Sequence, residues 1–201
     1  MFKLLVKMIL GSSRSSSHYR YSSRRSRRIY VQQNNNLEPY KNKALSDYEV
    51  RQGMSDMPNA QVRNVIDGDT VIVSKGRNNI KIRLDSIDCP EDGQEWGDKA
   101  KFGLIKLIGG KVIKLEEHGI DPHGRTLATL YVWHGQKQDW LNVNERMVTL
   151  GHAWVMRRYY DHLPKDRQSK LNSLENWSKS KKIGLWSCEQ PVAPWAWRNG
   201  G

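Results

Sequence analysis

The sequence predicts an α+β fold, a five-stranded OB-fold-like Greek-key β-barrel capped by about three α-helices. Two observations predict it. Five short stretches rich in β-branched residues are separated by turn signals, and helical stretches follow the third and the fifth of them. A chain of 201 residues, 37% of them hydrophobic, is long enough for one such domain with tails.

The first three predicted strands form an antiparallel meander. Residues 61–73 read QVRNVIDGDTVIV, two strand-like stretches that meet at a bend at residues 67–69. SKGRNN at residues 74–79 predicts the next turn, and the strand that follows has an apolar residue at every second position from Ile80 to Leu84.

A helix and two further strands follow the meander. In AKFGLIKLIGG, Phe102, Ile105 and Ile108 recur at helical spacing before two glycines end the helix. Residues 111–116 and 125–133 predict the fourth and fifth strands, and two later segments predict helices, residues 143–155 and 165–182.

The segments outside the barrel differ from it in composition. Residues 1–55 hold 11 Lys/Arg against three Asp/Glu and include a Ser/Arg/Asn-rich stretch, so we expect a disordered basic segment. Residues 56–188 are the expected domain. Residues 189–201 form a Trp/Pro-rich tail, whose tryptophans are expected to pack on the domain, with a stacking platform for bases as the alternative.

The N-terminal segment is compatible with several functions. Lys7 interrupts the first apolar stretch and no A-x-A-like site follows, so the sequence does not predict a secretory signal. The Arg/Ser-rich segment suits a transit peptide, a nucleic-acid-binding arm or a solvated tail. No apolar run reaches the ~18 residues of a membrane span. The two cysteines, Cys89 and Cys188, exclude a disulfide-dense scaffold and leave one disulfide open.

Acidic residues gather at two places that the meander brings together. Asp67 and Asp69 flank a glycine, a tripeptide that alone is typical of a plain turn. The third strand leads into RLDSIDCPE at residues 83–91, which adds Asp88 at the end of an adjacent strand. Carboxylates without histidine or cysteine partners favour Ca²⁺ or Mg²⁺, and the six histidines lack zinc-site spacing. Together the two clusters favour a metal site over a turn alone.

Arginines accompany these carboxylates. Arg83 lies in the second acidic cluster, and a guanidinium beside a metal site suggests a bound phosphate, because Arg matches phosphate oxygens with two parallel hydrogen bonds. Arg125 follows the turn DPHG and opens the fifth strand. Taken alone, Arg125 is better interpreted as a surface residue beside a turn. The net charge of +12 points to a polyanionic partner such as nucleic acid.

Four motifs in this order resemble the staphylococcal-nuclease-like (thermonuclease) family over residues 62–186. They are VIDGDTV (65–71), RLDSIDCPE (83–91), DPHGR (121–125) and VNERMVTLGHA (143–153). GLW at residues 184–186 is similar to the closing turn of the family, and PVAPWAWR at residues 191–198 is similar to the tail of bacterial members.

The resemblance implies one Ca²⁺ ion, held by Asp69, Asp88 and the backbone carbonyl of Cys89. Asp67 would be a supporting carboxylate nearby. Threonine usually stands at the position of Cys89. The change should leave a main-chain metal ligand intact, but it makes the site a candidate for redox control.

The resemblance also implies how the phosphodiester is handled. Arg83 and Arg125 would clamp the phosphate, and Glu91 would orient or deprotonate the attacking water. Tyr159 follows the GHA motif and is a candidate for base stacking or a phosphate contact. Pro122 and His123 stand where the family often has Lys-Tyr, so contacts to the second phosphate or the base are expected to differ.

These roles imply an enzyme. The resemblance predicts a Ca²⁺-dependent endonuclease, a phosphodiesterase that acts on DNA and RNA with little sugar specificity and leaves 3′-phosphate and 5′-hydroxyl ends. The alternative is a catalytically weak or inactive nuclease-like OB module that binds single-stranded nucleic acid. We expect a monomer. The resemblance favours a secreted or cell-envelope location, while the N-terminal composition also suits an organellar or intracellular one.

Overall fold

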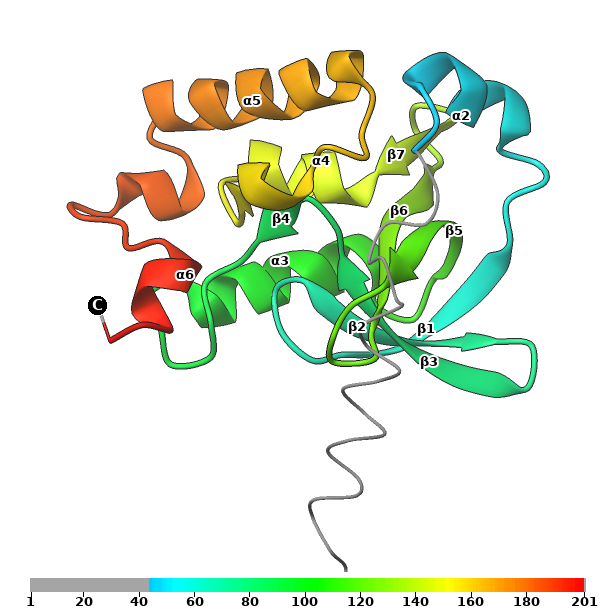
Figure 1. Cartoon of the computed structure of the whole chain (residues 1–201), viewed down its shortest axis with the longest axis horizontal. Coiled ribbons are helices and arrows are strands. Elements are labelled where there is room, and N and C mark those ends of the chain that lie inside the picture. The colour runs from blue at the N-terminus through cyan, green and yellow to red at the C-terminus, as the bar shows by residue number, and fades with distance from the viewer. Residues whose placement is uncertain (1–43, 201) are drawn as a thin grey trace, which may run out of the picture. The chain divides into compact units, whose positions relative to one another are not determined.

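The computed structural model describes residues 44–200, whose central element is a closed five-stranded barrel (Figure 1). Neighbouring strands in the order β3-β2-β1-β5-β6 are antiparallel, and parallel pairing of β3 with β6 closes the barrel. The predicted α+β, OB-like fold is therefore confirmed. The five strands are β1 (Asn59–Val65), β2 (Thr70–Lys75), β3 (Asn78–Leu84), β5 (Val112–Ile120) and β6 (Thr126–His134).

Short strands extend this framework. β7 (Asp139–Asn142) pairs with β6, and β4 (Ile87–Asp88) pairs with β8 (Trp154–Val155). The pairing of β4 with β8 ties the segment after β3 to the C-terminal half of the domain. Two 3₁₀ turns, η1 (Arg157–Tyr159) and η2 (Gly184–Ser187), complete that half.

Three helices of the described chain match the predicted ones: α3 (Gly97–Ile108), α4 (Val143–Thr149) and α5 (Lys165–Ser180). The prediction of one helix over residues 143–155 was too long. Gly151 has a φ of 63°, which ends the helical path, and the chain continues as β8. The buried stripe of α3 also differs from the expectation. Leu104 and Ile108 are buried, whereas Phe102 is 62% exposed.

The N-terminal boundary at residue 56 is corrected by α2 (Asp47–Gly53), which lies within the segment predicted to be disordered. Ser46 and Glu49 form a reciprocal capping box at its start. Val50 and Met54 pack with Tyr131 of β6. The prediction for residues 1–43 lies outside the described residues. Among residues 44–200, no helix has the length and apolar character needed to cross a membrane.

A buried ion pair joins α5 to the barrel. The Arg167 guanidinium donates to both carboxylate oxygens of Glu116 at 2.9 Å, and to the Thr129 hydroxyl. Glu116 also accepts hydrogen bonds from the Tyr131 hydroxyl and from the backbone N–H of Leu45. Arg167 is 3% exposed. This cluster therefore connects the segment before α2, the barrel and the first turn of α5.

Replacing Arg167 by alanine is expected to destabilise the fold by about 3–5 kcal/mol, because Glu116 would be left as a buried and uncompensated charge. Urea unfolding measures the loss. Arg77→Ala, at an exposed turn position, is the matched control. An unfolding midpoint of Arg167→Ala equal to that of the control would contradict a structural role for the pair.

Candidate active site

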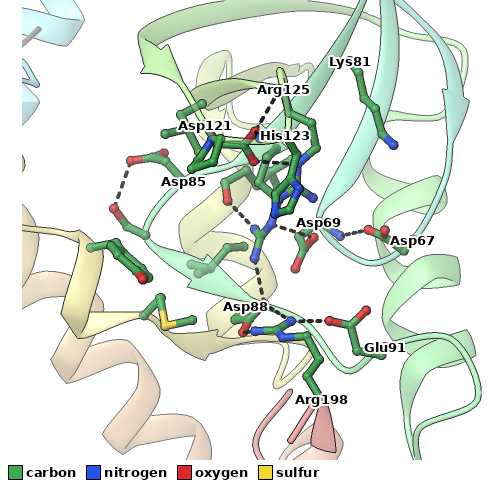
Figure 2. Close-up of a pocket in the computed structure, with 18 residues that line it drawn as sticks. Asp67, Asp69, Lys81, Asp85, Asp88, Glu91, Asp121, His123, Arg125 and Arg198 are labelled. Carbon is green, nitrogen blue, oxygen red and sulfur yellow. Dashed lines mark hydrogen bonds and ion pairs between the residues drawn. The ribbon is translucent and has the colours of Figure 1, made fainter. Parts of the chain in front are cut away.

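All predicted site residues except Cys89, which is buried beside Asp88, line one cavity of about 690 Å³ (Figure 2). Its walls come from the β1–β2 bend, the β3–β4 segment, the β5–β6 turn, η1 and the C-terminal tail. Seven of the side chains predicted from the sequence lie on it: Asp67, Asp69, Arg83, Asp88, Glu91, Arg125 and Tyr159.

The β1–β2 bend is both a tight turn and a wall of the cavity. Asp67 Oδ1 accepts a hydrogen bond from the backbone N–H of Asp69 at 3.0 Å, which fixes the turn. A Cβ on Gly68 would lie 2.6 Å from the Cβ of Cys89 and 2.9 Å from that of Ala100. Glycine is therefore required here, because the bend packs directly against the β4 segment and α3.

Asp69 is buried and faces the segment that follows β4. Its Oδ2 accepts the backbone N–H of Cys89 at 2.7 Å, and its Oδ1 lies 3.2 Å from Arg83 Nε. Burial raises the pKa of Asp69 to about 7, although Arg83 opposes the shift. More positive charge beside this carboxylate would favour its ionised form.

Arg83 lies between the two carboxylates that were predicted to hold the metal. Its Nη2 donates to Asp88 Oδ1 at 2.7 Å while its Nε faces Asp69. Burial alone would lower the pKa of Arg83, but the charges of Asp69 and Asp88 outweigh burial and raise it. The structure thus brings together two buried carboxylates from different elements.

This donor set fits a hard dication. Asp69 and Asp88 offer carboxylate oxygens, and Cys89, which is tied to Asp69 through its N–H, offers a main-chain carbonyl in the same segment. The pKa of the buried Asp69 carboxyl is raised, so a cation bound beside it would stabilise the ionised form and binding would release a proton.

The β5–β6 turn orients Arg125. Asp121 Oδ1 accepts the backbone N–H groups of His123 and Arg125 at 2.9 Å, and Asp121 Oδ2 accepts from Arg125 Nε at 2.7 Å. Burial would raise the pKa of Asp121, but these hydrogen bonds and the Arg125 charge lower it. Gly124 has a φ of 77°, which suits glycine. Arg125 and His123 both lie beside the cavity (Figure 2).

Sequence reasoning missed Arg198. This tail residue enters the same cavity, where its Nη2 donates to Asp88 Oδ2 at 2.7 Å and its Nη1 to Glu91 Oε1 (Figure 2). The sequence contains the PVAPWAWR motif, but its tryptophans and prolines predict only that the tail packs on the domain. Lys81 was also missed, although it lines the cavity two positions before Arg83 on the same face of β3.

The surroundings of Cys89 do not support redox control of the site. Cys89 is 3% exposed, its thiol lies 3.2 Å from the carbonyl oxygen of Gly68, and burial raises its pKa well above the ordinary value. Cys89 and Cys188 are both free thiols, so the disulfide left open by the sequence does not form in this structure. Tyr159 lines the cavity at its rim and is 45% exposed.

A second group of potential metal ligands, the side chains of Asp85, His118 and His162, is buried, and Asp85 also lines the cavity. Asp85 Oδ2 lies 2.8 Å from His162 Nε2, and Asp85 Oδ1 accepts from Thr129 and Asn144. Burial would raise the pKa of Asp85, but the nearby His118, the hydrogen bond and charge of His162, and the charge of Arg167 outweigh burial and hold that pKa below its usual range. Both oxygens of Asp85 are thus engaged by protein groups, which fixes the chain directly beyond β3.

A barrel with a cavity lined by buried carboxylates and by guanidiniums is the arrangement expected of a hydrolase of phosphodiester bonds. The family described as Staphylococcal nuclease homologue matches residues 81–188, which is more than half of the chain. The chain belongs to the staphylococcal nuclease homologue family. It is an endonuclease and its substrate is nucleic acid.

Bacterial relatives agree with this assignment. The chain is 36% identical over 139 residues to an "Uncharacterized endonuclease" of Escherichia coli O157:H7, covering 69% of this chain and 84% of the relative. It is 33% identical over 141 residues to a "Micrococcal nuclease" of Shigella flexneri, covering 69% and 79%. An "Uncharacterized endonuclease" of Haemophilus influenzae is 39% identical over 139 residues, covering 69% of this chain and 71% of the relative.

Proposed function

We propose that the protein is a Ca²⁺-dependent endonuclease that hydrolyses both DNA and RNA and leaves 3′-phosphate and 5′-hydroxyl ends. The observation that carries the proposal is the convergence of Asp69, Asp88, Arg83, Glu91 and Arg125 on one cavity. Asp69 and Asp88 each approach Arg83 within 3.2 Å. We further propose that the protein acts as a monomer, because one chain supplies the whole set.

One calcium ion is assigned to Asp69, Asp88 and the carbonyl of Cys89. Bound there, it would stabilise the negative charge that develops on the phosphate oxygens. Asp67 supports the site through its hydrogen bond to the Asp69 backbone. The burial of Asp69 and Asp88 excludes water from both carboxylates, which strengthens their attraction for a cation.

The phosphodiester is assigned to Arg83 and Arg125, whose guanidiniums are held by carboxylates before substrate arrives. Such preorganised donors stabilise the charge of the transition state without reorganisation. Glu91 orients the attacking water or takes its proton. The new P–O bond forms from that water, the P–O5′ bond breaks, and the 5′ oxygen takes up a proton. All these roles concern the phosphate and none concerns the sugar, which accounts for the proposed cleavage of both DNA and RNA.

The test uses the purified full chain with plasmid DNA, single-stranded DNA and RNA. We expect cleavage of all three in Ca²⁺, none with excess chelator, and 3′-phosphate with 5′-hydroxyl ends. Binding without calcium-dependent cleavage would instead support a nuclease-like module that holds single-stranded nucleic acid. Cleavage confined to one sugar type would refute the proposed lack of specificity.

The N-terminal segment gives a separate prediction. Residues 1–43 hold ten Lys/Arg against one acidic residue. Removing them should weaken nucleic-acid binding and flatten its dependence on salt, because fewer counterions are released. Binding by the truncated and full-length chains is compared across a salt series. An unchanged slope would mean that this segment does not contact nucleic acid. The cut is placed before residue 44 because α2 packs on the barrel.

A further inference from the structure

The C-terminal tail reaches the catalytic cavity along a defined path. Gln94, which is buried, accepts the backbone N–H of Glu91 at 2.9 Å and donates to the carbonyl oxygen of Val192 at 2.8 Å. One side chain therefore holds both the backbone of Glu91 and the start of the tail. The tail and the Glu91 loop are fixed relative to each other before Arg198 is reached.

A second anchor lies on the strand pair that holds Asp88. Trp154 in β8 pairs with Asp88 in β4, and Trp195 packs edge-on against Trp154 with ring centroids 5.6 Å apart. Pro194 is buried at the start of α6 (Pro194–Trp197), and the backbone N–H of Arg198 donates to the Pro194 carbonyl at 3.0 Å. These contacts set the position from which the Arg198 side chain extends.

The guanidinium of Arg198 bridges two carboxylates with different assigned roles. Its Nη2 donates to Asp88 Oδ2 at 2.7 Å, and its Nη1 donates both to Glu91 Oε1 and, at 3.4 Å, to Asp88 Oδ1. Within residues 44–200, the Glu91 carboxylate is held by its hydrogen bond and ion pair with Arg198. The side chain of Glu91 is 36% exposed, so packing alone does not set its orientation.

We propose that Arg198 is a positioning residue for the nuclease reaction, which holds the Glu91 carboxylate at a fixed place beside the metal-binding carboxylate Asp88. The inference rests on the proposed function, because it needs Glu91 to act on the attacking water. Arg198 acts through Glu91, unlike Arg83 and Arg125, which are assigned to the phosphate. A planar guanidinium can bridge two carboxylates, whereas an ammonium group has no such fork.

The test is a double-mutant cycle on the full chain in saturating Ca²⁺. Arg198→Ala should lower kcat by roughly 10- to 100-fold, as expected for a misplaced catalytic group, and leave KM within about twofold. In a Glu91→Gln background the same substitution should have little further effect. Arg198→Lys should restore part of the rate. Arg77→Ala, which removes an exposed arginine outside the cavity, should leave the rate unchanged.

Several outcomes would overturn the inference. If Arg198→Ala lowered kcat equally in the wild-type and Glu91→Gln backgrounds, Arg198 would act on the phosphate. A rise in KM at constant kcat would mean the same. If Arg198→Ala kept the wild-type kcat, Arg198 would have no role in the reaction. Thermal unfolding checks the fold, since a drop in Tm that explained the loss of rate would make Arg198 structural.

Calcium titration of the substrate-free chain gives a readout that needs no turnover. The Arg198→Ala variant should bind calcium several-fold more tightly than wild type, because the substitution removes a positive charge from beside Asp88. Equal or weaker binding would contradict contact between Arg198 and Asp88. If the wild-type chain neither bound calcium nor cleaved nucleic acid, the proposed function would be refuted. If it did both but the double-mutant cycle showed no coupling between Arg198 and Glu91, only this inference would be refuted.

Discussion

Arg125→Ala is expected to lower kcat by about 10²- to 10³-fold, a loss of ~3–4 kcal/mol of transition-state stabilisation. The Arg125 guanidinium is held by Asp121 at the edge of the cavity, where the phosphate is assigned. Folding should be preserved, because the ion pair with Asp121 is partly exposed and such pairs contribute ~1 kcal/mol or less. Initial rates in Ca²⁺, together with Tm, measure both quantities.

The control for Arg125→Ala is Arg63→Ala, an exposed arginine on β1 outside the cavity. It removes the same charge from the domain, so it reports any loss that comes from weaker attraction of nucleic acid. Arg125→Lys should recover only part of the rate, since lysine keeps the charge and loses the two parallel hydrogen bonds. If Arg125→Ala kept the rate of the control, Arg125 would not be a phosphate ligand.

Glu91→Gln should lower kcat by about 10²- to 10⁴-fold, the range for loss of a general base, with KM and Tm close to wild type. Glutamine keeps the size of the side chain and can still accept a hydrogen bond from Arg198, but it cannot take a proton. Initial rates in saturating Ca²⁺, together with Tm, measure these quantities.

Asp92→Asn is the matched control, because Asp92 neighbours Glu91 in the chain, is exposed and lies outside the lining of the cavity. It should retain full activity. A small effect of Glu91→Gln on kcat, similar to that of Asp92→Asn, would mean that water is positioned by another group.

The fold and most of the site were predictable because their signals are local. Alternation and turn residues define the meander, and the DGD bend and RLDSIDCPE occur at the ends of strands that pair directly. Asp69 and Asp88 are only 19 positions apart in the sequence, and pairing of β2 with β3 brings the segments that carry them to the same end of the sheet. What the sequence could not supply was the geometry around them, such as the place of Arg83 between both carboxylates.

Arg198 was missed because its position depends on contacts distant in sequence. It lies 110 positions after Asp88, and its approach requires Trp195 to pack on Trp154 and Gln94 to hold the tail. The helix α2 was missed for a similar reason. Short helices are marginal alone, and α2 buries Val50 and Met54 against Tyr131, a contact that its own composition does not reveal.

The state of Cys89 has a practical consequence. Its thiol is buried between the DGD bend and the β4 segment, with a raised pKa, and neither cysteine is paired with the other. No sulfur–sulfur bond has to form before the catalytic cavity is complete. The same active protein should therefore be obtained from a reducing cytosol or an oxidising periplasm, and its specific activity should not change when reductant is added during purification.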